Sequence, residues 1–438
     1  MSAPIDGSHD VALESWVESA NDGGTDFPIQ NLPLGVAVRE GTPHPRVCCA
    51  IGDQVLDLEA CAERGLLRGL PEAAESACRA RDLNPLMGLG ARIRATVRHR
   101  LSHLLRGEGG FVTARADAEA VLVPQSGMKM CLPATVGDYS DFYASIHHAT
   151  NVGRMLRPDN PLLPNYRWIP VGYHGRASSL VVSGTEVRRP SGQAAPQGDG
   201  PPSYGPSLSL DYELEVGVFL GPGNELGTPI PLAQTEGHLF GLCLVNDWSA
   251  RDVQKWEYQP LGPFLSKSFA TSLSPWVVTT EALAPFRVPA FTRADEDPGP
   301  LDHLRHDEDM AHGGFDLRLE VALSTAAMRR EGRPPFVVSR SNLKDLYWTL
   351  AQMVAHHSSN GCNIRPGDLI ASGTVSGPEK ENRGCLLERT WRGTEPLELP
   401  SGEERRFLED GDEVVLRGHC ERDGFARIGF GECRGVIV

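Results

Sequence analysis

Acidic side chains alternate with apolar ones in the segment LDYELEVGVFL at residues 210–220. The alternation predicts a β-strand on which Glu213 and Glu215 point to the same side, roughly 7 Å apart at their Cβ atoms. Two like charges this close are tolerated either on a wet surface or around a cation. From this strand alone, a solvent-facing acidic strand is the favoured interpretation, and a cation site is the alternative.

Two further carboxylates shift the balance towards a cation. Asp247 ends an apolar run that begins at Gly241, and Asp141 lies in the segment GDYSDFY. Oxygen ligands of this kind suit a hard cation, Mg²⁺ or Ca²⁺, better than zinc. The sequence does not establish that the four carboxylates converge, and a turn or helix cap is the alternative role for Asp141.

Two basic side chains are candidates for proton chemistry. His148 is a candidate general base beside such a cation, because imidazole titrates close to working pH. The pair His356 and His357 competes with it but is expected to be structural, near the end of a helix. Only five of the 42 basic residues are lysine. Lys267, flanked by apolar and small residues, is therefore either a functional ammonium or an ordinary surface residue.

The elements that must position these groups are mostly strands. A helix is predicted over 92–105 and another over 341–358, while 190–206 and 292–314 are predicted loops because of their Pro, Gly and polar content. Short runs bounded by Gly, Pro and Asp predict strands; they cover residues 34–38, 47–51, 54–58, 180–183, 212–220, 241–246, 276–279, 315–323, 368–372 and 413–418.

Composition excludes several classes of protein. The 438 residues predict two or three domains, and 40% hydrophobic with 23% charged residues is typical of a folded globular chain. The net charge of −15 argues against a nucleic-acid partner, and the one basic cluster, at 92–106, is expected on the solvated side of a helix. No long apolar run or N-terminal signal is evident, so neither a membrane span nor export is expected. The ten cysteines form no CxxC pair and are expected to be free thiols of a cytoplasmic protein.

Several common catalytic motifs are absent from the sequence. It contains no GxSxG, no Gly-Lys dipeptide and no HExxH. These absences argue against an ordinary α/β-hydrolase, a Walker-type nucleotide site and a zinc peptidase.

A set of collinear motifs closely resembles the fumarylacetoacetase family. They are FPIQNLPLG (27–35), GDYSDFY (137–143), HATNVG (148–153), PVGYHGRASS (170–179), DYELE (211–215), NDWSARDVQKWEYQPLGPFLSKSF (246–269), NGCNIRPGDLIASGT (360–374) and LEDGDEV (408–414). DYELE and NDWSARD alone would indicate only the wider superfamily. The FPIQNLP segment and the long block at 246–269 point to this family itself.

The resemblance implies a fold that is mainly β with some α. A flexible lead-in at 1–25 would precede an N-terminal SH3-like β-barrel at 26–128 and a C-terminal mixed β-roll at 129–438. It also implies a homodimer. The two predicted loops and the longer lead-in are where this chain departs most clearly from the family pattern, and they touch none of the implied site positions.

The resemblance also implies roles for individual residues. Asp141, Glu213, Glu215 and Asp247 would bind Ca²⁺, and Asp247, Lys267 and Thr271 would form an Mg²⁺ site, with Lys267 contributing its backbone oxygen because an ammonium cannot bind a cation. His148 would be the base, oriented by Glu388. Lys267 and Gln254 would donate to the oxyanion. The implied substrate contacts are Tyr143, Arg157, Tyr173, Gln254, Tyr258 and Thr374.

The implied reaction is hydrolysis of a carbon–carbon bond in a small diketo acid, 4-fumarylacetoacetate. The products would be fumarate and acetoacetate, in the last step of tyrosine and phenylalanine catabolism. Two alternatives remain open. One is acylpyruvate hydrolysis or another diketo-acid reaction of the superfamily, and the other is a catalytically silent binding protein on the same fold.

Overall fold

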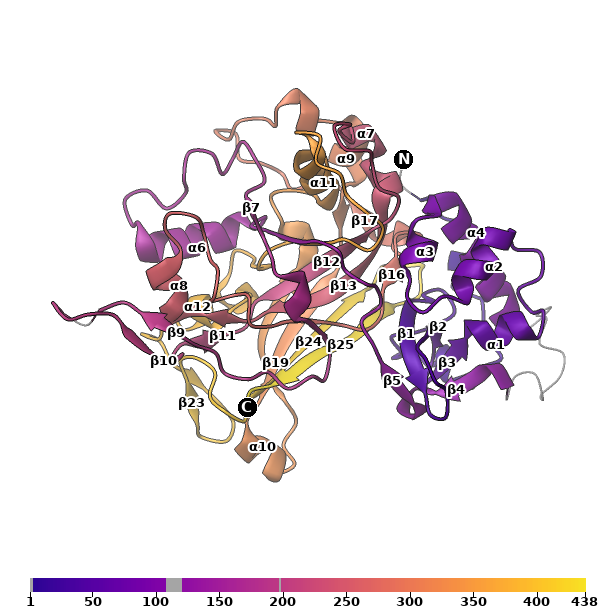
Figure 1. Cartoon of the computed structure of the whole chain (residues 1–438), viewed down its shortest axis with the longest axis horizontal. Helices are drawn as coiled ribbons and strands as arrows, with labels where there is room; N and C mark the ends of the chain where they lie inside the picture. Colours follow the sequence, from indigo (N-terminus) through magenta and orange to yellow (C-terminus); the bar gives the residue numbers. More distant parts are fainter. Residues whose placement is uncertain (1–2, 108–119, 197) are drawn as a thin grey trace.

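The computed structural model describes residues 3–107, 120–196 and 198–438. The N-terminal part is built on a five-stranded antiparallel sheet of order β4-β3-β2-β1-β5 (Figure 1). Gly52, at the tight turn between β2 and β3, has φ of 56°, a conformation that glycine adopts without steric cost. The strands of this sheet are β1 (Leu34–Arg39), β2 (Arg46–Ile51), β3 (Gln54–Asp57), β4 (Leu122–Pro124) and β5 (Met128–Met130). Its helices are α1 (Leu58–Glu63), α2 (Glu72–Cys78), α3 (Asn84–Met87) and α4 (Gly90–Leu105).

The C-terminal part contains an eight-stranded mixed sheet that positions the site. Its order is β7-β6-β21-β12-β13-β15-β8, with β16 also paired to β13. The long central strands β12 (Leu214–Leu220) and β13 (Leu239–Asp247) are buried along their whole length, which explains their nearly continuous apolar sequences. The others are β6 (Tyr139–Phe142), β7 (Gly172–His174), β8 (Leu180–Val182), β15 (Thr271–Leu273), β16 (Val278–Thr279) and β21 (Leu369–Ala371).

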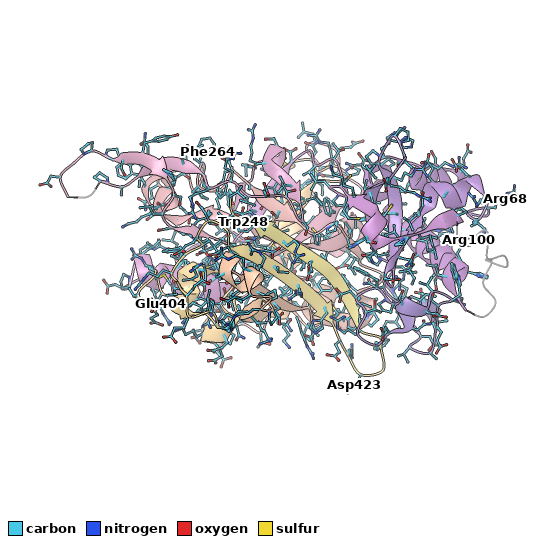
Figure 2. The ribbon with its side chains drawn as sticks, turned by 90° about the horizontal axis from the view of Figure 1, so that it is seen from below. Arg68, Arg100, Trp248, Phe264, Glu404 and Asp423 are labelled. Carbon is cyan, nitrogen blue, oxygen red and sulfur yellow. The ribbon has the colours of Figure 1, made fainter. Side chains whose placement is uncertain are left out.

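A second sheet packs against the first. It has the order β20-β19-β24-β25, with β19 (Arg318–Ser324), β20 (Phe336–Asn342), β24 (Glu413–Cys420) and β25 (Ile428–Val436). Trp248 lies fully buried between the sheets, and Figure 2 places it beside the long strands of the second sheet. A Cβ atom on Gly435 of β25 would come within 2.7 Å of the Trp248 ring, so only glycine allows this close approach.

Shorter elements complete the C-terminal part. The strands are β9 (Ser191–Ala194), β10 (Ser203–Pro206), β11 (Leu210–Asp211), β14 (Ser249–Ala250), β17 (Arg287–Val288), β18 (Gly314–Phe315), β22 (Leu397–Glu398) and β23 (Glu404–Arg405). The helices are α6 (Ile146–Leu156), α7 (Leu232–Thr235), α8 (Arg251–Glu257), α9 (Asp307–His312), α10 (Ala326–Arg330), α11 (Leu350–Ser358) and α12 (Leu386–Arg389).

The structure corrects three local predictions. The predicted loop at 190–206 contains the paired strands β9 and β10, which project from one end of the molecule (Figure 1). The predicted loop at 292–314 contains α9. The predicted helix at 341–358 begins only at Leu350, because Ser341 still pairs in β20 and Thr349 forms a capping box with Gln352.

The N-terminal lead-in and the basic helix pack together, contrary to expectation. His9 is buried, and its Nε2 lies 2.8 Å from the backbone oxygen of Glu281. Arg98 of α4 donates to Ser8 Oγ at 3.1 Å and to the backbone oxygen of Asn31 at 2.6 Å. Arg94, on the same helix, is buried and donates to Glu281 Oε2 at 2.6 Å. Part of the basic cluster is therefore buried and paired, and residues predicted as a flexible lead-in are held by it.

The predicted fold class, mainly β with some α, is confirmed. The boundary between the two parts at residue 128 stays a prediction. All ten cysteines are free thiols, as expected. Within the described ranges, no helix combines the length and the apolar character needed to cross a bilayer.

Candidate active site

Strand register brings three carboxylates to one end of the large sheet. Asp141 on β6 lies beside Ala371, and Asp247 at the end of β13 lies beside Thr271. Glu215 projects from β12 between them. One oxygen from each of Asp141, Glu215 and Asp247 can be chosen so that all three atoms lie within 4.8 Å of one another.

These carboxylates have the properties of cation ligands. Asp141, Glu215 and Asp247 are almost fully buried, and Asp141 Oδ1 and both oxygens of Glu215 have no hydrogen-bond partner within the protein. Burial, and then the mutual repulsion of the carboxylates, raises the pKa of Asp141 and of Glu215 well above the usual range. Buried carboxylate oxygens without donors are costly unless a cation or a proton binds them. The donor set is all oxygen, so it fits a hard divalent cation.

Glu213 lies apart from this group of three. It precedes the first residue of β12, and its carboxylate accepts from Arg251 Nη1 at 2.7 Å and from Lys267 Nζ. Burial raises its pKa, but Lys267, Arg251 and His148 together lower it below the usual range. Glu213 is therefore already balanced by two cationic side chains, and its role as a fourth ligand stays a prediction.

Asp247 connects the carboxylates to their surroundings. Its Oδ2 accepts from Lys267 Nζ at 2.6 Å and from the Tyr173 hydroxyl at 2.9 Å, and its Oδ1 accepts from Thr271 Oγ1 at 2.9 Å. Burial lowers the pKa of Lys267, but Asp247 and Glu213 raise it more, so the ammonium is retained. The interpretation of Lys267 as a surface residue is wrong, because the side chain is buried among carboxylates.

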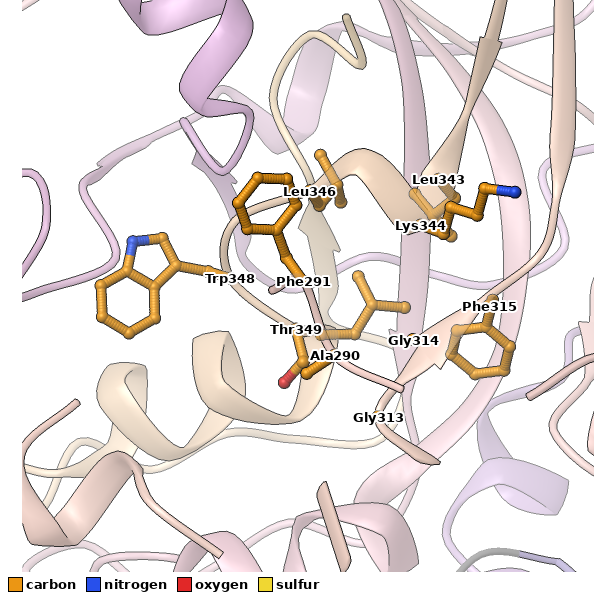
Figure 3. Close-up of a pocket in the computed structure, with 11 residues that line it drawn as sticks. Ala290, Phe291, Gly313, Gly314, Phe315, Leu343, Lys344, Leu346, Trp348 and Thr349 are labelled. Carbon is orange, nitrogen blue, oxygen red and sulfur yellow. The ribbon is translucent and has the colours of Figure 1, made fainter. Parts of the chain in front are cut away.

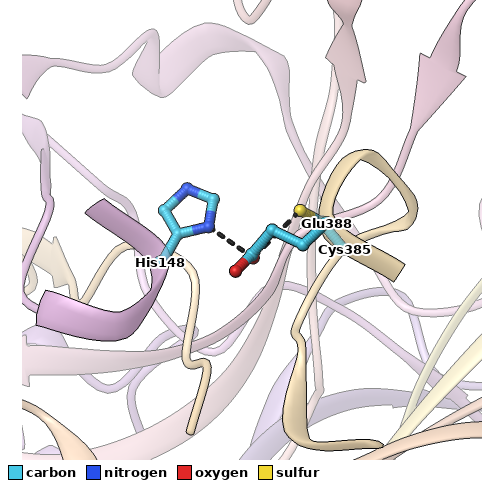
Figure 4. A group of neighbouring side chains, drawn as sticks. All are labelled: His148, Cys385 and Glu388. Carbon is cyan, nitrogen blue, oxygen red and sulfur yellow. Dashed lines mark hydrogen bonds and ion pairs between the residues drawn. The ribbon is translucent and has the colours of Figure 1, made fainter. Parts of the chain in front are cut away.

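His148 and Glu388 form a buried pair (Figure 4). The Nδ1 of His148, on α6, lies 2.5 Å from Glu388 Oε2 on α12. Glu388 also accepts from Asn151 Nδ2 at 2.8 Å, Ser376 Oγ at 2.8 Å and Cys385 Sγ at 3.3 Å. Burial raises the pKa of Glu388, but His148 and these donors bring it down to about 2, so the carboxylate is ionised. A carboxylate with this many donors orients the imidazole and, unlike Glu215, lacks the open oxygens of a cation ligand.

The pair borders the carboxylate group. His148 contributes to the lowered pKa of Glu213. The ring of Tyr143 meets the His148 ring edge-on at 5.1 Å, and burial, then Glu388 and Glu213, raises the pKa of Tyr143. The pair therefore adjoins Glu213, which shares Lys267 with Asp247 of the carboxylate group. A base beside a group of cation ligands is the arrangement that metal-assisted hydrolysis requires.

The predicted substrate contacts are placed unequally. Tyr143 and Tyr173 adjoin the site through the contacts given above. Thr374 is buried, and its Oγ1 has no partner within the protein. Gln254 on α8 accepts from Arg251 Nη1 at 3.0 Å. Arg157 donates to the backbone oxygen of Pro161 at 3.3 Å, and the Tyr258 hydroxyl accepts from Gln259, which immediately follows it. The roles of Arg157 and Tyr258 stay predictions.

Sequence reasoning missed several residues that the structure draws into the site. Arg251 binds Asp211, Glu213 and Gln254, and it lies inside the quoted NDWSARD motif. Asn151, which binds Glu388, lies inside HATNVG. The quoted motifs contain both residues, so the resemblance could have marked them. An arginine or an asparagine does not by itself indicate which residue, more than 30 positions away, it will bind.

A pocket elsewhere on the C-terminal part is separate from this site. Figure 3 shows residues that line it, among them Phe291, Phe315, Leu343, Leu346 and Trp348. None of its lining residues is among the site residues.

Asp309 is an additional buried carboxylate outside the site, and it stabilises the start of α11. It accepts from Thr349 Oγ1 at 3.0 Å. Burial raises the pKa of Asp309 from 3.8 to about 6, with Glu236 adding to the shift and Thr349 opposing it. The unfolded chain therefore releases this proton at lower pH than the folded protein does. The protonated Asp309 carboxyl therefore contributes to the free energy of unfolding. This contribution is fully present below pH 4 and is lost as pH rises through about 6.

We expect Asp309→Asn to remove this pH dependence. Between pH 4 and 7 the unfolding free energy of the variant should rise relative to the parent protein by about 3 kcal/mol, because two pKa units correspond to that amount. Urea titrations at several pH values measure the difference. Asp307→Asn, an exposed position on the same helix, is the control and should show little change. A constant difference between Asp309→Asn and the parent at all pH values would contradict the assignment.

Comparison with known proteins covers almost the whole chain. Residues 139–438 match the family described as Fumarylacetoacetate (FAA) hydrolase C-terminal, and residues 30–133 match Fumarylacetoacetase N-terminal. The chain is 50% identical to the fumarylacetoacetase of Bos taurus over 429 residues, which cover 97% of this chain and 98% of that protein. It is 46% identical to the fumarylacetoacetase of Arabidopsis thaliana, again over 97% of this chain and 98% of that protein.

Solved structures support the fold alone. A fumarylacetoacetate hydrolase from Exiguobacterium antarcticum superposes with a TM-score of 0.50 at 14% identity, covering 93% of this chain and 99% of that one. A putative HpcE protein from Mycobacterium smegmatis superposes with the same TM-score at 20% identity, covering 92% and 98%.

Proposed function

This chain belongs to the fumarylacetoacetase family and hydrolyses the carbon–carbon bond of fumarylacetoacetate, and we propose that it does so with a divalent cation at the three carboxylates and His148 as the base. The observation that carries the proposal is the pairing of open, buried carboxylate oxygens with an adjacent His148–Glu388 pair. Identity near 50% over the whole chain does not favour an acylpyruvate hydrolase or a silent binding protein.

The cation would be held by Asp141, Glu215 and Asp247, with Glu213 and Thr271 as further candidates. When bound, it would act as a Lewis acid on the carbonyl oxygens of the substrate. Calcium fits an all-carboxylate set with flexible geometry, and magnesium at Asp247, Thr271 and the backbone oxygen of Lys267 is the second assignment. We therefore propose calcium as the first assignment and magnesium as the second.

The side chains of this chain would move the proton and hold the charge. Glu388 accepts a hydrogen bond from the protonated Nδ1 of His148, which leaves Nε2 as the basic nitrogen that takes a proton from water. The oxygen of that water attacks the ketone carbon on the fumaryl side, and the carbon–carbon bond then breaks to give fumarate. The electron pair of the broken bond leaves on acetoacetate, which takes up a proton. Lys267 and Gln254 would donate to the oxyanion formed during the attack.

The remaining predicted residues would bind the two ends of the substrate. Arg157 is suited to a carboxylate because its guanidinium presents parallel donors. Tyr143, Tyr173 and Thr374 would place the reacting carbon near His148, and Tyr258 would contact the end nearest α8. This reaction would be the last step of tyrosine and phenylalanine catabolism.

We expect purified protein to consume fumarylacetoacetate, so that the ultraviolet absorbance of this substrate falls, and to release fumarate and acetoacetate in equal amounts. Product analysis by chromatography distinguishes this result from nonspecific loss. Acylpyruvates tested at the same concentration are the comparison, and a higher kcat/KM for them would reassign the substrate.

A homodimer also belongs to this proposal. Several large apolar side chains near α8 are exposed: Leu261 by 94%, Leu208 by 84% and Phe264 by 68%. Figure 2 shows Phe264 towards the end from which the β9–β10 hairpin projects. An apolar group of this kind is typical of a protein–protein contact, and a second copy would cover it. Sedimentation equilibrium should give twice the chain mass of 47.5 kDa, and the mass of a single chain would exclude it.

We further propose a cytoplasmic location. All ten cysteines are free and eight are buried, which is typical of a protein kept in a reducing compartment. Fractionation of cells that produce the protein would test this location.

A further inference from the structure

Asp211 is a buried carboxylate that the proposed mechanism does not use. It is the last residue of the short strand β11, which pairs with β14, and its side chain is 0% exposed. It is also the first residue of the DYELE motif, whose two glutamates lie in or beside the cation site. A charged side chain at a fully buried position needs strong partners to be tolerated.

One set of those partners is the backbone of the helix that carries Glu388. Asp211 Oδ1 accepts from Leu386 N at 2.8 Å, and Oδ2 accepts from Leu387 N at 2.9 Å. These are the first two residues of α12, whose own N-cap residue, Cys385, provides no side-chain cap. Asp211 therefore caps α12 from a distant strand, and Glu388 is the third residue of that helix.

The other partner is Arg251 at the start of α8. Asp211 Oδ2 accepts from Arg251 Nε at 2.9 Å. The same guanidinium donates through Nη1 to Glu213 Oε1 at 2.7 Å and to Gln254 Oε1 at 3.0 Å. Asp211 thus contacts both α12, the helix that carries Glu388, and Arg251, which binds Glu213 and Gln254.

We propose that Asp211 is a positioning residue that fixes the His148–Glu388 pair relative to Arg251, Glu213 and Gln254. The inference rests on the proposed function for its catalytic readout. Oδ1 of Asp211 accepts from Leu386 N, and Oδ2 accepts from both Leu387 N and the Arg251 guanidinium. An amide in its place would turn an N–H₂ group towards a backbone N–H of α12 in either orientation, and in one orientation towards the guanidinium as well, so the support of α12 would be weakened. A displacement of about 1 Å at a reacting group is enough to cost about 10²-fold in rate.

The experiment compares Asp211→Asn with Asp57→Asn. Asp57 is a matched control, because it is also 0% exposed, caps a helix by accepting from Ala60 N at 3.0 Å, and accepts from Arg46 Nη1 at 2.8 Å. It lies in the N-terminal part, away from the site. Both substitutions should lower the melting temperature through loss of a cap and of a buried ion pair.

Only Asp211→Asn should change catalysis. We expect its kcat to fall by about 10²-fold with little change in KM, because the reacting groups are displaced while Arg157, Tyr173 and Thr374, which Asp211 does not hold, still bind the substrate. Asp57→Asn should keep the parent kcat per folded molecule. Equal kcat values for the two variants would show that Asp211 has only a structural role and would overturn the proposal.

A second readout needs no substrate. The short His148–Glu388 hydrogen bond should give a far-downfield proton resonance in the parent and in Asp57→Asn, and this resonance should shift or vanish in Asp211→Asn. If the parent fails to hydrolyse fumarylacetoacetate, the proposed function fails, and the resonance still tests the positioning role. Asp211→Glu, which keeps the charge but moves it by one methylene, replaces Asp211→Asn if the latter does not fold. Failure of both to fold would assign Asp211 to stability alone and overturn the proposal.

Discussion

Replacing His148 by alanine is expected to lower kcat by about 10²–10⁴-fold with a smaller effect on KM. The imidazole is buried, its Nδ1 is held 2.5 Å from an ionised Glu388, and its ring meets Tyr143 at the edge of the site. Removal of a positioned general base typically costs this much, because water must then be deprotonated without assistance. Steady-state kinetics on fumarylacetoacetate measures the effect, with the folding of each variant checked by circular dichroism.

The neighbouring histidine provides the control. His147 lies on the same helix, but its ring packs against Phe291 at 6.1 Å. His147→Ala therefore changes the same type of side chain at the adjacent position without touching Glu388, and its kcat should stay close to that of the parent protein. Near-normal turnover of His148→Ala would exclude His148 as the base and leave the carboxylate group to activate water alone.

The motifs predicted where the chemistry would lie better than they predicted how its members would pair. Asp141, Glu215 and Asp247 each lie at or near the end of a strand, so their convergence follows from the register of one sheet. Glu213 shows the limit of this reasoning. The alternation placed it on the same side as Glu215, but it gave no indication that Arg251 and Lys267 would bind its carboxylate.

Long-range partners could not be predicted from local pattern. Glu388 lies 240 positions from His148, and only the resemblance, not spacing or periodicity, paired them. Arg94 and Arg98 were assigned to the solvated side of a helix because apolar residues alternate with them. Their burial depends on hydrogen bonds to Glu281 and to backbone oxygens of the N-terminal segment. The spacing of apolar residues along a helix cannot predict such distant partners. The hairpin β9–β10 was missed for a different reason, since its Pro, Gly and Gln content is typical of loops.

Glu215→Gln is expected to abolish cation-dependent activity and to make the order of stability of variant and parent depend on whether the cation is present. Both oxygens of Glu215 lack partners in the protein, and burial beside Asp141 and Asp247 raises its pKa. Glutamine has nearly the same shape but no charge, so it removes a ligand while leaving the packing intact. Since loss of a group that only supports a ligand costs 10–100-fold in metal affinity, loss of the ligand itself should cost about 100-fold or more. Calorimetric titration of chelator-treated protein with Ca²⁺ and with Mg²⁺ measures this loss.

The melting temperature gives the sharper test, because the difference between variant and parent should change sign when the cation is added. In excess chelator, Glu215→Gln should be more stable than the parent, since it carries one fewer buried charge among three carboxylates. In saturating cation the parent should be the more stable, because binding to the folded state stabilises it in proportion to affinity. A site that served only as an acidic surface would show neither the difference nor its reversal.

Glu281→Gln separates this effect from the general cost of changing a buried glutamate. Glu281 is also buried, but it is paired with Arg94 at 2.6 Å and lies away from the carboxylate group. Breaking a buried pair leaves an uncompensated charge and typically costs about 3–5 kcal/mol. Glu281→Gln should therefore lower the melting temperature equally with and without cation and leave the affinity for Ca²⁺ unchanged. If both variants respond to the cation in the same way, the open oxygens of Glu215 are not ligands, and the cation must bind elsewhere.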